Sequence, residues 1–322
     1  MKKQFFAVLT ALAEAVLITA CGNNQQIISP TPTGTEVNNP TDTIKPTDTP
    51  TDKPVTPTAG ETTPTASEPS GDPTPTSTPT PTPLPQKDLS EFNPLDFFKD
   101  AIYIGDSLMN FYQWRGNSYV HPDIFGKYSA KLWQAVNSFA VRFAIRDVST
   151  LSEAELGFVP KYNGEARQMW DVVAESGKTR VFMFFGLNDI GVSGVDKFIE
   201  QYQELIGKIK AKTPAVKIYI MSITSMRKDK QSTTGGLSNA KIKEANERLE
   251  ALCAQNGWCF VDVASKLRDA DYNLLLTLPD GTKISDGTNV HIEKAGYVFW
   301  DEALEKTARE ELRKEYYEGG NK

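Results

Sequence analysis

Four short runs of mostly apolar residues follow one another along the chain, at residues 101–104, 181–185, 217–221 and 259–263. The apolar positions in each run are nearly continuous and do not alternate with polar ones. Continuous burial is typical of strands covered on both faces in a parallel sheet, whereas a strand with one wet face alternates. The pattern therefore predicts a buried parallel sheet.

Between these runs, apolar residues recur every three to four positions, which predicts helices. This spacing occurs within residues 198–209 and 242–252, and a last helix is expected from residue 294 to about residue 315. Strands that alternate with helices indicate an α/β protein, and we expect a three-layer αβα sandwich with a central parallel sheet. Residues 129–147 fit both a strand near 132–136 and a helix, and the sequence leaves that segment open.

Residues 1–21 are typical of an export signal. Two lysines precede an apolar stretch at residues 5–20, which is short for a membrane span and ends in small residues before Cys21. Residues 17–21, Leu-Ile-Thr-Ala-Cys, resemble a bacterial lipobox, although Glu14 departs from the pattern. We expect lipidation at Cys21 and a domain held outside the cytoplasm on the outer face of the cell membrane. An ordinary cleaved signal peptide is the alternative.

Residues 22–89 are rich in Thr, Pro, Ser and Asp, and they hold 15 of the 20 prolines. Such a segment cannot bury enough apolar surface to fold, so we expect a disordered, semi-rigid linker. A glycosylated spacer is the alternative. Residues 90–322 then form one domain with a sizeable core.

Charge and motif content narrow the class of function. The formal net charge is −6 and no long basic run occurs, so nucleic-acid binding is unsupported. No Cys/His cluster has metal-ligand spacing and no glycine-rich phosphate loop is present, so we expect neither a metal nor a cofactor. Cys253 and Cys259 form an even pair in an exported domain, and they are expected either as a disulfide or as two buried thiols.

The strongest chemical signal is Gly105-Asp106-Ser107-Leu108, directly behind the first apolar run. This position puts a serine at the carboxyl edge of the sheet, where ligands bind in open α/β folds. A serine nucleophile needs a base and an oxyanion hole. Only two histidines exist, and we prefer His291, in a polar loop before the last helix, to His121, which precedes a proline.

With these residues the chain resembles the SGNH, or GDSL-type, hydrolase family over residues 99–305, and the resemblance implies a flavodoxin-like SGNH hydrolase fold. Ser107 matches the nucleophile, and its own N–H matches one oxyanion donor. Residues 186–189, Gly-Leu-Asn-Asp, match the block in which Asn188 donates its amide to the oxyanion. The loop at residues 286–291 matches the block with His291 as general base and Asp286 as the residue that orients it.

Two departures from the family pattern bear on the site. Thr288 stands three residues before the histidine, where the family has aspartate, so Asp286 must reach back across a loop that is two residues longer. If it cannot, Ser107 and His291 act as a dyad. The block with an oxyanion-hole glycine has no glycine here, and the backbone N–H of Ala140 is the nearest candidate. Ser107 and Asn188 could also serve merely as caps of the following helix and turn.

The expected function is that of a serine esterase that removes a short acyl group, acetyl above all, from a carbohydrate such as a cell-wall or plant polysaccharide. The alternatives are a lysophospholipase, a thioesterase or an acyltransferase with the same machinery. A different class is a degenerate family member that only binds the cell wall. The expected partners are an acylated carbohydrate or other small ester and, through the amino-terminal anchor alone, a membrane.

Overall fold

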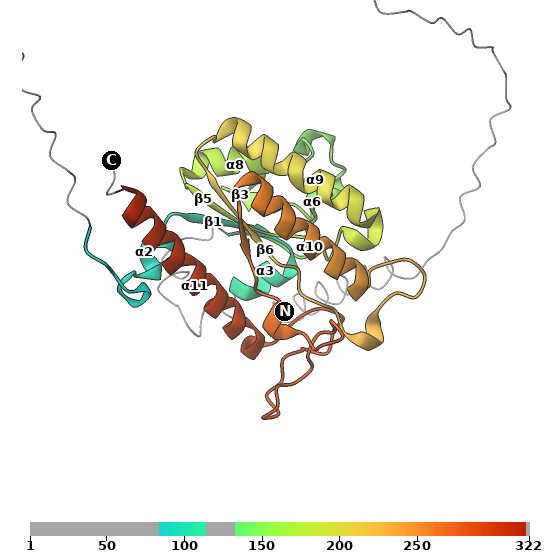
Figure 1. Ribbon diagram of the computed structural model, residues 1–322. Coiled ribbons are helices and arrows are strands. Elements are labelled where there is room, and N and C mark those ends of the chain that lie inside the picture. The colour runs from blue at the N-terminus through green and yellow to red at the C-terminus, as the bar shows by residue number, and fades with distance from the viewer. Residues whose placement is uncertain (1–83, 114–132, 320–322) are drawn as a thin grey trace, which may run out of the picture. The chain divides into compact units, whose positions relative to one another are not determined.

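The computed structural model describes residues 84–113 and 133–319 (Figure 1). The expected lipidation site Cys21, most of the linker, and His121 lie outside the described residues. The described residues belong to a compact unit that spans Pro83–Lys322. Among the described residues, no helix is both long and apolar enough to cross a bilayer.

A five-stranded sheet forms the centre of this unit, and every neighbouring pair of its strands is parallel. Its order is β2-β1-β5-β6-β7, which in order along the chain is the 2-1-3-4-5 arrangement of flavodoxin-like folds. All four expected strands are present, and the segment that the sequence left open supplies the fifth. The strands are β1 (Ala101–Gly105), β2 (Trp133–Ala135), β5 (Arg180–Phe184), β6 (Lys217–Met221) and β7 (Cys259–Val261).

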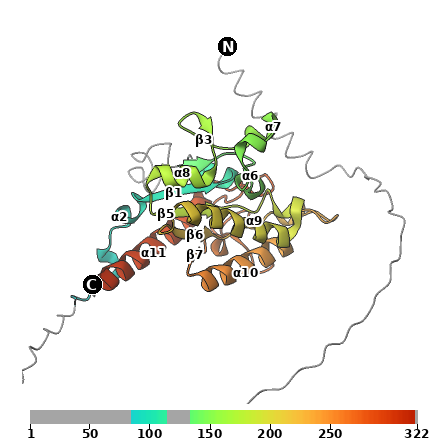
Figure 2. The same cartoon turned by 90° about the horizontal axis from the view of Figure 1, so that it is seen from above.

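Helices cover both faces of the sheet, so the expected three-layer αβα sandwich is confirmed (Figures 1 and 2). One face carries α6 (Val141–Ala144), α8 (Met169–Ser176), α9 (Ile190–Lys212) and α10 (Asn239–Asn256). The other carries α2 (Pro94–Phe98), α3 (Ser107–Phe111) and α11 (Lys294–Gly319). Shorter elements are α7 (Glu153–Leu156), the β3–β4 hairpin (Lys161–Tyr162, Glu165–Ala166) and the 3-10 turns Leu89–Glu91, Val148–Thr150, Lys228–Lys230 and Ser265–Leu267.

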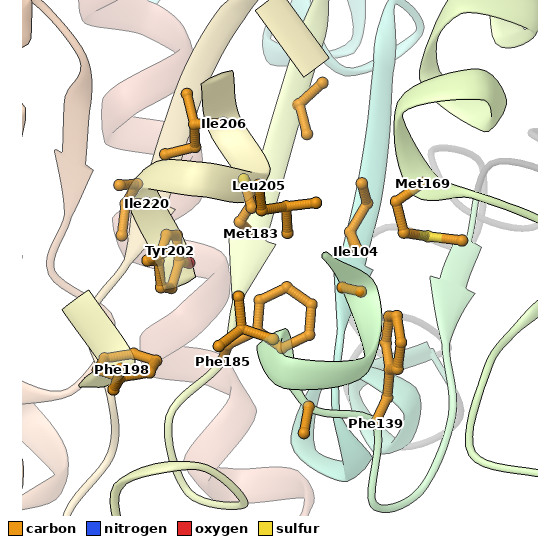
Figure 3. Packing of buried hydrophobic residues seen from close by; sticks show 14 of the residues in the cluster. Ile104, Phe139, Met169, Met183, Phe185, Phe198, Tyr202, Leu205, Ile206 and Ile220 are labelled. Carbon is orange, nitrogen blue, oxygen red and sulfur yellow. The ribbon is translucent and has the colours of Figure 1, made fainter. Parts of the chain in front are cut away.

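Each continuous apolar run divides its side chains between two cores. In β1, Ile102 and Ile104 enter the core under α8, α9 and α10, whereas Tyr103 enters the core under α2 and α11. The reason is that successive side chains of a strand point to opposite faces. Figure 3 shows the first of these cores, which contains Ile104 and Met183 from the strands and Tyr202 from α9.

An aromatic ladder crosses four strands on the α11 face. Trp133, Tyr103, Phe182 and Tyr219 occupy one register row from β2 to β6. Adjacent rings are stacked with centroids 4.6 Å, 5.2 Å and 4.7 Å apart. Stacked aromatic side chains on neighbouring strands stabilise a sheet through both area burial and ring geometry. The ladder therefore fixes the register of the strands that lead to the carboxyl edge.

Of the two alternatives for the cysteine pair, the structure has the thiols. Cys253 lies in the core under α10, and Cys259 packs against the core on the opposite face of the sheet. The sheet separates the two sulfur atoms, which explains why closeness in sequence does not produce a disulfide here. Burial raises the pKa of both thiols to about 12.

The last helix, α11, runs from the carboxyl ends of the strands to their amino ends. It starts three residues after His291 and ends where Glu315 binds Arg180, the first residue of β5, at 2.8 Å. Its last turns also hold the beginning of the domain, because the Lys87 N–H donates to the Tyr317 hydroxyl at 2.8 Å. The first described residues are thus attached at the amino edge of the strands.

Truncation of the central ladder residue provides a test of this packing. Phe182 is fully buried, so Phe182→Ala should lower the free energy of unfolding by about 3–5 kcal/mol, whereas Phe182→Leu should cost less. Urea unfolding followed by far-UV circular dichroism measures the difference. A loss below about 1 kcal/mol for Phe182→Ala would contradict the role of the ladder.

Candidate functional site

The candidate site lies at the point where the strand order reverses. From β1 the chain crosses to β2 on one side of the sheet and later returns to β5 on the other side. The loops that leave β1 and β5 therefore diverge, and in open α/β sheets this divergence creates the ligand-binding crevice. Ser107 follows β1, Asn188 follows β5, and Ala140 follows β2.

Close packing at the end of β1 determines where Ser107 lies. A Cβ atom on Gly105 would come within 2.7 Å of the Met109 Cβ and 2.8 Å of the Phe184 carbonyl oxygen, so only glycine fits. Asp106 then caps α3 by accepting a hydrogen bond from the Leu108 N–H at 2.9 Å. Ser107 is the first residue of that helix and is 7% exposed.

The structure brings Ser107 and His291 together, as the sequence predicts. Ser107 Oγ lies 2.9 Å from His291 Nε2, although the residues are 184 positions apart. The ring of Phe111 contacts the imidazole edge-on, with centroids 4.8 Å apart. Because Phe111 is four residues after Ser107 on α3, it lies on the same side of the helix as the serine. The pair has the geometry of a nucleophile and its base.

The longer loop before His291 closes as a hairpin. Ser285 pairs with Ile292 in an antiparallel bridge, and the Asp286 N–H donates to the His291 carbonyl oxygen at 3.2 Å. The two additional residues therefore lie in the turn, and they leave Asp286 and His291 opposite each other at its ends. The Asp286 carboxylate accepts hydrogen bonds from the N–H and hydroxyl of Thr288 at 2.9 Å and 2.7 Å.

Arg227 supports this hairpin from the segment that follows β6. The Arg227 guanidinium donates to the Gly287 carbonyl oxygen at 2.8 Å, and the Arg227 backbone N–H donates to the Asn289 carbonyl oxygen at 2.9 Å. Asp229 binds the other side of the same guanidinium at 2.8 Å. These two contacts to carbonyls of the same turn hold the backbone that carries His291.

The loop after β5 meets the loop after β2. Gly186 has a φ of +135°, and a Cβ there would lie 2.5 Å from the Ile223 Cδ1, so glycine is required at this bend. The Asn188 side-chain amide donates to the Phe139 carbonyl oxygen at 3.2 Å. Asn188 is thus tied to the residue next to Ala140, which is fully buried in an extended conformation before α6.

Two buried carboxyl groups flank these loops. Burial raises the pKa of Asp106 to about 8, so at neutral pH most of this group is protonated and adds little negative charge beside Ser107. Burial also raises the pKa of Asp189 to about 6, with Arg142 and two backbone N–H groups acting in the opposite direction. At neutral pH most of Asp189 is therefore ionised. In the described part of the chain, no group of three or more His, Cys, Asp or Glu side chains could hold a metal ion.

Two side chains at the site, Arg142 and Arg227, were not identified from the sequence. Arg142 and Arg227 had no local signal, because each acts on a loop that is distant in sequence.

Comparison with protein-family models matches residues 103–299 to the GDSL-like lipase/acylhydrolase family. The matched segment contains Ser107, Asn188, Asp286 and His291. A comparison with curated proteins finds no match.

Several solved structures are similar to the chain. A GDSL-like lipase from Bacteroides thetaiotaomicron shares 17% identity, with 70% of this chain and 94% of that chain covered and a TM-score of 0.44. A member of the lipolytic protein G-D-S-L family from Veillonella parvula shares 17% identity. The match covers 64% of this chain and 96% of that chain, with a TM-score of 0.40. A carbohydrate esterase family 3 structure from Talaromyces cellulolyticus shares 16% identity. The match covers 67% of this chain and 98% of that chain, with a TM-score of 0.38. Similarity at this level carries no information on the substrate.

The raised pKa of Asp106 predicts a pH-dependent stability. The native group keeps its proton up to about pH 8, whereas the ordinary pKa is 3.8, so between these values the native state binds more protons than the unfolded state. The contribution of Asp106 to stability therefore falls as the pH rises through this window. Asp106→Asn removes this ionisation. Urea unfolding from pH 4 to pH 9 should show that the free energy of unfolding of the variant, relative to that of the wild type, rises with pH. Parallel curves for the two proteins would contradict the assignment.

Proposed function

Because the chain belongs to the GDSL-like lipase/acylhydrolase family, we propose that it is a serine esterase that removes a short acyl group, acetyl, from a carbohydrate. The observation that carries the serine mechanism is the 2.9 Å separation between Ser107 Oγ and His291 Nε2 at the switch point of the sheet.

In the proposed reaction, the Ser107 hydroxyl attacks the ester carbonyl carbon while His291 Nε2 takes its proton. The carbonyl oxygen becomes an oxyanion, which accepts hydrogen bonds from the Ser107 N–H, the Ala140 N–H and the Asn188 amide. His291 then gives the proton to the leaving alcohol oxygen, and the acyl group remains on Ser107. Water, deprotonated by His291, releases the acid by the same route.

We assign Asp286 the task of orienting the His291 ring and stabilising the imidazolium that forms. Its place across the hairpin from His291 supports this assignment, because the turn keeps the two residues opposite each other. Thr288 fixes the carboxylate through two hydrogen bonds, and this lowers the freedom of the side chain. An orienting carboxylate beside the base is typical of serine hydrolases.

Two features support a carbohydrate over a lipid as the acyl carrier. In the described ranges, the exposed large apolar side chains are Val192 and Leu276, so no broad apolar surface faces a lipid layer there. The expected Cys21 anchor and the long linker suit an enzyme that is held on a membrane and acts on a polymer beyond it. We therefore propose an exported, lipid-anchored enzyme whose partner is an acylated polysaccharide.

The esterase assignment predicts a serine-dependent turnover of small esters. The full chain should hydrolyse p-nitrophenyl acetate faster than the octanoate, and Ser107→Ala should lower the rate by about a thousandfold or more. Ser149→Ala, at an exposed position away from the site, serves as the control and should keep the wild-type rate. Release of acetate from acetylated xylan, measured enzymatically, tests the polymer.

The possible outcomes separate the alternatives. No Ser107-dependent turnover of any ester would leave a binding module without esterase activity. A preference for octanoate, or for lysophospholipid over acetylated xylan, would favour a lysophospholipase and overturn the carbohydrate proposal. Acyl transfer to an added alcohol in preference to water would identify an acyltransferase.

For Asp286, replacement by asparagine removes the charge and keeps an oxygen that can accept from Thr288. Asp286→Asn should lower kcat by about a hundredfold or more, since an uncharged amide does not stabilise the imidazolium. Steady-state kinetics with p-nitrophenyl acetate measures the change, and thermal unfolding checks that the hairpin is intact. Full activity of Asp286→Asn would leave Ser107 and His291 as a dyad.

A further inference from the structure

We propose that Asp189 and Arg142 form a positioning brace that holds together the two loops carrying oxyanion donors. The inference rests on the proposed function, because it assigns the brace to the hole formed by Asn188 and Ala140. Neither residue is proposed to touch the substrate. Asp189 acts through the backbone of the loop after β2, and Arg142 acts through the backbone of the loop after β5.

The contacts of Asp189 run to the residues that follow Ala140. One carboxylate oxygen accepts from the Val141 N–H at 3.1 Å, and the other accepts from the Arg142 N–H at 3.2 Å. Asp189 is the residue directly after Asn188, and its side chain is fully buried. The first two N–H groups of α6, directly after Ala140, are therefore held by a carboxylate of the loop that follows β5.

Arg142, from the β2 side, in turn binds the loop that follows β5. Its guanidinium donates to the Asn188 carbonyl oxygen and lies 3.4 Å from the Asp189 carboxylate. With the bond from the Asn188 amide to the Phe139 carbonyl, three residues that follow β2 and two that follow β5 are connected. An oxyanion hole acts through donors that are already in place before reaction, so a brace at this point affects the rate.

The charge of Asp189 matters for this role, because a carboxylate accepts from N–H groups more strongly than a neutral group does. Burial raises the pKa of Asp189 to about 6, and Arg142 acts against this rise. Among the described residues, Asp106 and Tyr202 also act electrostatically with Asp189. At neutral pH Arg142 is therefore the cation that balances Asp189.

The first test measures how the brace affects kcat and KM. Asp189→Asn should lower kcat for p-nitrophenyl acetate by about 10- to 100-fold while KM changes less than about threefold, because the donors act on the transition state. Arg142→Met should lower kcat in the same way. Arg146→Met serves as the matched control: this nearby arginine pairs with Glu155 and should keep the wild-type kcat.

A pH profile separates positioning from a general loss of structure. Arg142→Met removes the cation that lowers the pKa of Asp189, so the acid limb of kcat should move to higher pH. In the Asp189→Asn background the same substitution should produce no such shift. If the shift persists there, Arg142 acts on His291 and the brace is overturned.

The outcomes also distinguish this inference from the proposed function. Wild-type kcat in folded Asp189→Asn, or effects of the two substitutions that simply multiply, would overturn the brace and leave the esterase intact. Absence of Ser107-dependent turnover in the wild type would overturn the proposed function itself. Thermal unfolding of each variant is compared with that of Arg146→Met, so a kcat loss that only follows a lower Tm counts against positioning.

Discussion

The parallel register of β1 against β5 is the constraint on which the site depends. Gly105 lies opposite Phe184, so both strands end at one level and the residues beyond them enter the same crevice. Two residues earlier in each strand, the stacked rings of Tyr103 and Phe182 fix this register. A slip by one residue would turn each side chain to the opposite core, and it would move the serine away from the asparagine.

The electrostatics at this edge follow from how the carboxyl groups are buried. Asp106 is held by an N–H of its own helix, burial and the charge of Asp189 raise its pKa, and it stays largely protonated at neutral pH. Asp189 has Arg142 and two N–H groups, and it is largely ionised. Asp189 thus keeps a negative charge beside the loops that follow β2 and β5, and Arg142 balances that charge. In the proposed mechanism, this balance means that the developing oxyanion meets its donors with little opposing negative charge.

Local patterns were sufficient to predict the strands, the layers and the family, because continuous apolar runs and a glycine-bounded serine are local signals. They also indicated Ser107, Asn188 and His291, which follow strand ends or a terminal loop. The course of the longer loop could not be derived from spacing, since it depends on Ser285 pairing with Ile292. The fate of the cysteines was equally open, because it depends on which face of β7 Cys259 occupies. The roles of Cys21 and the linker stay predictions.

The attachment of the first described residues to the end of α11 has a consequence for access. Lys87 is bound by Tyr317, and the carbonyl of Ser90 accepts from Arg309 at 3.2 Å. The chain thus enters the domain at the pole opposite Ser107. A support that holds the protein by its preceding residues pulls on the back of the domain, so tension is carried by α11 and not by the loops around His291. The proposed polymeric substrate would then meet a pole of the domain that is not the point of attachment.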